Sequence, residues 1–300
     1  MNTTPHDMNT TPHDSTLTTA DGRSALRMER RLPHPPEKVW AALTDPAALR
    51  GWFPAEVTVD LTRGGPMSFR FPGAEAGDPG TTGTVTDVEE PRLFAFTWGT
   101  DHLSWTVTPD GEGSLLTLVH TFGDRPGAAS FASGWQLCVG ALARLLDGAP
   151  AGTGRDRGGL HESYISRFGL DRGTAEPVGP VGPDGSEGRR VRFERQLVRP
   201  AETVWAVLSA GIEPVAGLPV PEGFTAATAP AGPVTEVRAP RSLTYAVEPH
   251  SAVTWELGEG TGHGARLVLT QTGPVNWDTD AALAAWRTRI EQLAAALVDA

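Results

Sequence analysis

Short runs of alternating apolar and polar residues fill the first half of the chain. They are rich in Val, Thr, Phe and Trp and are separated by turn signals such as GG, DPG, EEP and PDGEG. Period-two alternation with β-branched and aromatic residues is typical of half-buried strands. The pattern therefore predicts a meandering antiparallel sheet. Its expected strands are 57–61, 67–71, 83–88, 93–98, 103–108 and 115–122.

Helical spacing appears on either side of these strands. A first strand (27–32) meets a proline, and Glu37 then opens a short segment with Val39, Trp40 and Leu43 at helical spacing. The end of the chain predicts a long helix, with N-cap candidates at 278–280. Its apolar positions step by three and four residues: Leu283, Trp286, Ile290, Leu293 and Leu297.

The same order of elements occurs twice. Residues 29–43, ERRLPHPPEKVWAAL, align without a gap to 194–208, ERQLVRPAETVWAVL. Further along, 85–96 match 234–245, and 116–121 match 267–272. The offset falls from 165 to 149 between the first two matches, so the second copy lacks 16 residues there. A repeat of this length indicates two copies of one fold.

The boundaries follow from composition. Residues 1–14 read MNTTPHD twice and have no apolar residue besides methionine, so we expect a disordered tail over 1–24, with Met8 as an alternative start. Residues 171–188 combine Gly, Pro and acid without periodicity, which is typical of a linker. The expected domains are thus 25–170, with a ligand cavity, and a shortened 189–300.

Composition narrows the function classes. Lys plus Arg total 25 against 36 Asp plus Glu, and the net charge of −11 repels phosphate backbones and anionic lipids. We therefore expect no nucleic-acid partner. The single Cys138 lies in an apolar periodic stretch, which favours a buried structural thiol in a reducing setting. No secretion signal or membrane-inserting run is recognisable, so a cytoplasmic protein is expected.

Several segments of the first copy resemble a known family. They are PPEKVWAALTDPAALRGWF, the RGG turn into SFRF, GTVTDVEEPRLFAFTW, LTLVHTF and GWQLCVGALARLLDG. They look like the SRPBCC superfamily (START and Bet v 1-like), and within it the branch called activator of heat-shock protein 90 ATPase homologue, C-terminal-like. The resemblance covers about 25–170 and matches the second copy in part. It implies an α+β fold of two helix-grip domains, each a curved antiparallel sheet wrapped on a long C-terminal helix.

The resemblance also implies a cavity between sheet and helix that holds an apolar or amphipathic small molecule. Alternation places Leu116, Leu118 and His120 toward the helix, with Gln271 in the matching register of the second copy. Because the second copy lacks one wall, its pocket should be small or filled, and it is expected to contact the first domain. The residues expected to line the ligand site are Trp52, Phe53, Phe69, Trp98, Trp105, Leu118, His120 and Gln136.

The chemistry of that site stays open. His120 is the one candidate for acid–base catalysis, because its ordinary pKa of about 6.5 lies near working pH, but a hydrogen-bonded strand-end histidine is the alternative. Arg70 could bind a carboxylate or face solvent. Asp156, His161 and Glu162 are expected in a solvated turn. No hydrolase, metalloprotease or phosphate-binding motif occurs, so neither cofactor nor metal is expected.

Three functions remain to be weighed. A carrier or sensor for an apolar small molecule needs only the cavity. A polyketide cyclase or dehydratase, as in some members of the superfamily, also needs His120 as acid–base. Regulation of a chaperone ATPase is suggested by the family's name alone.

Overall fold

The computed structural model describes residues 15–73, 80–150, 156–180, 187–227, 231–247, 251–262 and 264–299. The repeated MNTTPHD segment lies outside the described residues. The chain divides into two compact units, residues 1–160 and 161–300, and each is described by itself.

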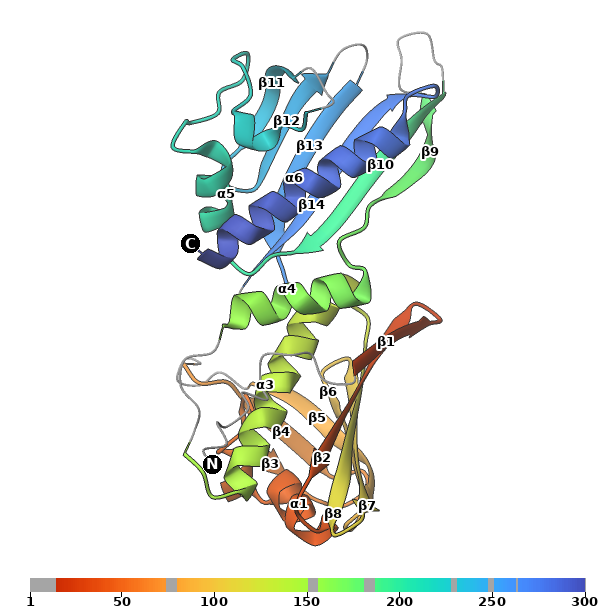
Figure 1. Cartoon of the computed structure of the whole chain (residues 1–300), viewed down its shortest axis with the longest axis vertical. Coiled ribbons are helices and arrows are strands. Elements are labelled where there is room, and N and C mark those ends of the chain that lie inside the picture. The colour runs from red at the N-terminus through yellow and green to blue at the C-terminus, as the bar shows by residue number, and fades with distance from the viewer. Residues whose placement is uncertain are drawn as a thin grey trace, which may run out of the picture. The chain divides into compact units, whose positions relative to one another are not determined.

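The first unit contains one antiparallel sheet of eight strands in the order β1-β2-β8-β7-β6-β5-β4-β3 (Figure 1). Most neighbours in this order are also neighbours in the chain, as a meander requires. The strands are β1 Ser15–Ala20, β2 Arg23–Leu32, β3 Glu56–Val59, β4 Pro66–Arg70, β5 Thr81–Glu89, β6 Leu93–Trp98, β7 Asp101–Asp110 and β8 Gly113–Phe122.

Helices cover one face of this sheet. The long helix α3 (Ala128–Leu146) crosses it (Figure 1), and buries Trp135, Val139 and Leu142. The short helices α1 (Pro36–Thr44) and α2 (Pro46–Leu49) connect β2 to β3. Each begins at a proline, whose fixed φ suits the first helical position. The Asp45 side chain accepts a hydrogen bond from the backbone N–H of Ala47 (2.8 Å) and so caps α2.

The second unit repeats the plan with six strands in the order β11-β12-β13-β14-β10-β9. Its helix α6 (Thr279–Asp299) runs across the sheet (Figure 1), and begins beside the Asp278 carboxylate, as the sequence predicted. The other elements are α4 Arg157–Phe168, β9 Thr174–Pro180, β10 Glu187–Gln196, α5 Ala201–Ser209, β11 Ala231–Arg238, β12 Ser242–Val247, β13 Ser251–Glu259 and β14 Ala265–Pro274, with a 3-10 turn at Glu222–Phe224. The first unit has a 3-10 turn at Arg125–Gly127.

The two sheets correspond strand by strand. Strands β2, β8, β7, β6 and β5 match β10, β14, β13, β12 and β11, and β1 matches β9 as the partner of the first long strand. Strands β3 and β4 have no counterpart in the second sheet, which agrees with the 16 missing residues. The predicted fold is confirmed: each unit is an antiparallel sheet with a long C-terminal helix across it.

Two edge strands were missed from the sequence. Residues 15–20, expected in the disordered tail, form β1, and residues 174–180, expected in the linker, form β9. A signal for the first existed, because Asp21 and Gly22 both have positive φ (51° and 74°) in the turn that joins β1 to β2. An Asp-Gly pair between alternating runs is a strong hairpin signal. Strand β9 contains prolines, which a strand at the sheet edge tolerates.

The segment after α3 is also a correction. His161 and Glu162, expected in a solvated turn, lie on helix α4, and the unit boundary falls at 160/161 rather than after 170. Asp156 does stand at a turn, where its carboxylate accepts a hydrogen bond from the Gly159 N–H (2.7 Å) at the start of α4. The helical periodicity was hidden by two glycines, Gly158 and Gly159, and by the polar residues His161 and Glu162, which are buried or half-buried.

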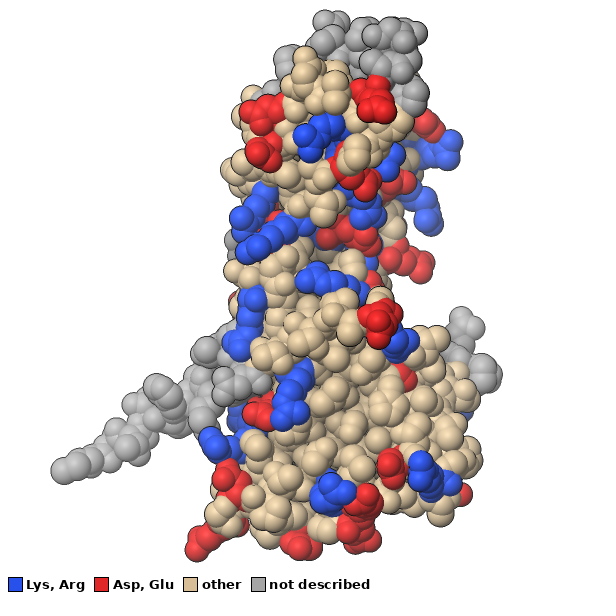
Figure 2. All heavy atoms as spheres, turned by 90° about the vertical axis from the view of Figure 1, so that its right-hand side faces the viewer, with Lys and Arg blue, Asp and Glu red and all other residues tan. Residues whose placement is uncertain are grey.

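The outer face of the first sheet is polar but carries few charges. Ser104 and Thr106 alternate with inward, buried residues of β7, and Thr117 does the same on β8. Figure 2 shows the first unit, in the lower part of the view, as mostly uncharged, with charged side chains near its lower edge. In the described part of the chain, no helix has both the length and the hydropathy needed to cross a bilayer.

Candidate functional site

The centre of the first domain is a crossing of two tryptophans. Trp105 on β7 and Trp135 on α3 meet edge to face, with ring centroids 5.5 Å apart and planes at 81°. Such T-shaped pairs are favoured by the ring quadrupoles. Trp52 packs edge-on against Trp105 (5.6 Å) and donates its indole N–H to the Ala42 carbonyl (2.9 Å). Trp52 and Trp105 are thus buried packing residues.

His120 lies where alternation predicted, on the inner face of β8, and both of its ring nitrogens are engaged. The Trp135 indole N–H donates to His120 Nδ1 (3.1 Å), and His120 Nε2 lies 3.0 Å from Asp101 Oδ2. An indole N–H can only donate, so Nδ1 carries no proton and Nε2–H donates to the Asp101 carboxylate. The histidine side chain is 4% exposed. This geometry leaves no ring nitrogen free for a substrate and favours a structural role.

The expected hollow interior is filled by side chains. The two cavities beneath α3 measure about 10 Å³ each. That is roughly the space of one water probe, whereas small-molecule sites usually span about 300–1,000 Å³. One is lined by Trp105, Leu118 and Gln136, the other by Trp52, Phe53 and Phe69. All six residues surround the interior, and the sequence could not show that their own side chains occupy the space.

A stack of aromatic rings leads from this interior to the surface. Trp98 stacks on the buried Phe69 with ring centroids 4.5 Å apart and planes at 16°. Phe71 stacks on Trp98 (5.8 Å, 21°), as does Phe53 (5.3 Å, 28°). Phe71 is 49% exposed, which is high for so large an apolar side chain. Trp98 was expected to line the ligand site, whereas Phe71, which directly follows β4, was not.

An open groove of about 500 Å³ lies at the outer end of this stack, beside β3 and the end of β4. Its size suits a small molecule, whereas the two cavities beneath α3 are too small for one. Its lining residues are Arg50, Phe53, Pro54, Ala55, Glu56, Arg70, Phe71, Pro72 and Gly73. The groove is built from β3, β4 and the segment before them, the part that the second copy lacks.

The second domain repeats the tryptophan crossing but not this groove. Trp255 and Trp286 meet at 5.8 Å and 79°, and the Trp286 indole N–H donates to Gln271 Oε1. Gln271 therefore accepts the indole hydrogen bond of Trp286, as His120 accepts that of Trp135. Phe224 packs edge-on against Trp255 (5.7 Å, 89°) and is fully buried, so it fills the place that Trp52 takes in the first domain.

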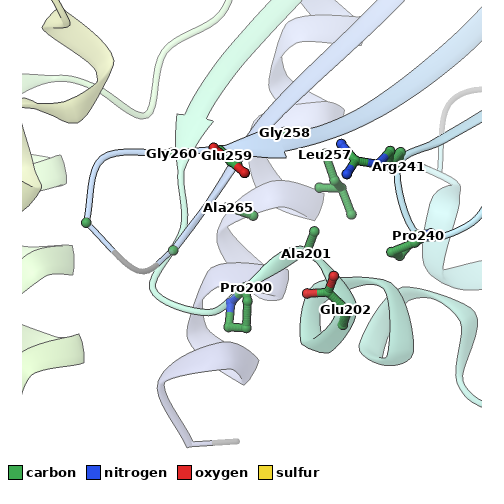
Figure 3. Close-up of a pocket in the computed structure, with 12 residues that line it drawn as sticks. Pro200, Ala201, Glu202, Pro240, Arg241, Leu257, Gly258, Glu259, Gly260 and Ala265 are labelled. Atoms are coloured by element: carbon green, nitrogen blue, oxygen red, sulfur yellow. The ribbon is translucent and has the colours of Figure 1, made fainter. Parts of the chain in front are cut away.

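The second domain has a surface pocket of its own. It measures about 330 Å³ and lies between the first turn of α5 and the end of β13 (Figure 3). Pro200, Pro240 and Leu257 supply apolar lining, while Glu202, Arg241 and Glu259 bring charges of both signs. That the interior of this domain is small or filled stays a prediction from the sequence.

A buried ion network holds α4 to the second sheet. Arg195 lies on the inner face of β10 with its side chain 1% exposed, and pairs with Glu162 on α4 and Glu291 on α6. Burial alone would lower the pKa of Arg195, but the two carboxylates raise it above its ordinary value. Burial would raise the pKa of Glu162, yet hydrogen bonds from His161 and Arg195 and the charge of Arg195 bring it below its ordinary range.

Comparison with known proteins identifies the first domain. The family model described as "Activator of Hsp90 ATPase homolog 1-like protein" matches residues 33–147, from the loop before α1 to the end of α3. The match therefore covers most of the first domain and none of the second. The match includes β3, β4 and the groove, and it confirms the resemblance seen in the sequence. No curated protein matches the chain.

Several solved structures match parts of this chain. CalU16 from Micromonospora echinospora is 20% identical over 52% of this chain and 95% of that chain, with a TM-score of 0.42. A conserved protein of unknown function, EF2215 from Enterococcus faecalis, is 20% identical over 51% and 90%, with a TM-score of 0.44. DynU16, described as a putative protein in the dynemicin biosynthetic locus, is 21% identical over 92% and 97%, with a TM-score of 0.39.

Proposed function

We propose that the first domain binds an apolar or amphipathic planar small molecule, as a carrier or sensor, at the groove beside β4. The observation that carries this proposal is the stack of rings from Phe69 through Trp98 to the half-exposed Phe71, which ends in a depression of about 500 Å³. A planar ligand that covers Phe71 would extend the stack and remove its apolar surface from water.

Filled cavities and paired polar groups support binding at the groove rather than chemistry in the interior. A ligand beneath α3 would have to displace Trp52, Phe53 or Trp105, each of which is packed against other rings. His120 would have to give up Asp101 or Trp135 to exchange a proton with a substrate. The groove needs no such rearrangement.

The test is a fluorescence titration of the full chain with the neutral planar probe N-phenyl-1-naphthylamine. Phe71→Ala removes the outer ring of the stack and should weaken binding about fivefold, in keeping with roughly 1 kcal/mol for an aromatic contact. Leu61→Ala is the matched control, because Leu61 is 38% exposed in the same domain but does not line the groove. Equal affinities of the two variants would refute the groove as the site.

A further inference from the structure

The groove beside β4 also carries charge. Arg50 and Arg70 both line it and both are exposed. Among the described residues, neither guanidinium has a hydrogen-bond or ion-pair partner. Four other arginines of this domain are held: Arg23 by backbone carbonyls, and Arg27, Arg31 and Arg92 by carboxylates.

One carboxylate stands nearby without neutralising them. Glu56 on β3 is the direct cross-strand neighbour of Arg70 on β4. No ion pair joins these two side chains within the described residues, although opposite charges across a strand pair usually attract. The lining thus contains two guanidinium groups and one carboxylate, a local excess of positive charge in a chain whose net charge is −11.

The two arginines are close in sequence to the apolar residues of the groove and line the groove together with them. Arg50 ends α2, three residues before Phe53, and Arg70 directly precedes the half-exposed Phe71. Aromatic surface and unpaired guanidinium groups therefore meet in one depression. Guanidinium groups present planar forks of donors that match carboxylates and related anions.

We propose that the ligand of this groove is a planar aromatic anion, whose rings stack on Phe71 while Arg50 and Arg70 hold its carboxylate or sulfonate group. The inference rests on the function proposed above and adds the chemical class of the ligand. The arginines set specificity: they favour an anionic aromatic molecule over a neutral one of the same shape.

The test compares two probes that share the N-phenylnaphthylamine skeleton, 8-anilino-1-naphthalenesulfonate and neutral N-phenyl-1-naphthylamine. With the full chain, the double variant Arg50→Gln/Arg70→Gln should bind the sulfonate about tenfold more weakly, since two partly exposed ion pairs are lost. Its affinity for the neutral probe should change less than about twofold. Raising the salt concentration should weaken the sulfonate alone. Arg63→Gln, an exposed arginine of the same domain outside the lining, is the control.

The outcomes separate the two proposals. If the double variant binds the sulfonate as the unaltered chain does, or loses both probes equally, the arginines do not select the anion and the inference is wrong. A neutral-probe affinity that still depends on Phe71 would then leave the binding function standing. If Phe71→Ala affects neither probe, the function and the inference fail together.

Discussion

The two domains of this chain share a scaffold and differ in what surrounds it. Both cross a strand tryptophan with a helix tryptophan, Trp105 with Trp135 and Trp255 with Trp286. In both domains the indole N–H of the helix tryptophan donates to a side chain at the same position of the equivalent strand, His120 or Gln271. Only the first domain has β3 and β4, and with them the aromatic stack and the groove. The repeated part is therefore the packing core, while the candidate binding site belongs to the part that is not repeated.

A second difference concerns an arginine that occurs in both copies. Arg30 and Arg195 are equivalent and lie on the inner faces of β2 and β10. Arg30 is half-buried, and burial lowers its pKa although the charge of Asp147 opposes the shift. Arg195 is enclosed by Glu162 and Glu291, and the position equivalent to Glu291 in α3 is Gly140. The arginine is therefore the centre of an ion-pair network in the second domain but not in the first.

The largest effect should come from removing Arg195. Arg195→Ala leaves Glu162 and Glu291 without their common partner and should destabilise the second domain by about 3–5 kcal/mol. Arg30→Ala, the matched change, should cost about 1 kcal/mol or less, because Arg30 keeps contact with water. Urea denaturation of the full chain, read by hydrogen exchange in each domain, measures both. Equal losses of stability in the two variants would mean that the ion pairs of Arg195 add no stability beyond that of a half-buried arginine.

The next effect separates two roles of His120. His120→Ala leaves the Trp135 indole N–H and the Asp101 carboxylate without a partner and should destabilise the first domain by about 2–3 kcal/mol. His120→Gln copies the arrangement of Gln271 and should cost less than about 1 kcal/mol, because an amide oxygen can accept from the indole. The same hydrogen-exchange experiment reports the difference. If glutamine is as harmful as alanine, the bond to Asp101 is the important one.

The smallest effect is a pH dependence confined to the second domain. The pKa of Glu162 is lower in the folded chain than its ordinary value of 4.5. Its contribution to stability is therefore complete above about pH 4.5 and is lost as the pH falls through the lower, folded value. Pulse proteolysis with pepsin in urea, between pH 5 and pH 3, should show the second domain losing stability. Glu162→Gln should abolish that loss, and an unchanged pH dependence in this variant would assign it elsewhere.

Hydrophobic periodicity predicted the elements correctly wherever one face of a strand or helix is regularly apolar. The strand 93–98 was predicted to the residue, and Leu116, Leu118 and His120 all point inward as alternation required. Edge strands were harder, because β1 and β9 bury one side or less and contain polar residues or proline. The helix α4 was missed because its buried residues include His161, and because Glu162 pairs with Arg195, a partner distant in the sequence.

The candidate site was predicted in part. Phe53 and Trp98 were expected near a ligand and do lie in the stack, while Arg70 was left between a ligand role and a solvent role. Phe71 and Arg50 were not predicted as site residues. The local sequence pattern does not indicate that β3 and the end of β4 lie beside α2. Trp52 and Trp105, expected as possible lining, are buried and pack edge to face against each other.

The sequence by itself determined that one sheet-and-helix fold occurs twice and that the second copy is shorter. Period and repetition are properties of the chain order, so they can be read without coordinates. Only the tertiary structure decided that the first interior is full, that both nitrogens of His120 are engaged, and that the open space lies outside the sheet–helix interface. Packing density and hydrogen-bond partnership depend on side chains brought together from distant segments, and no local pattern contains that information.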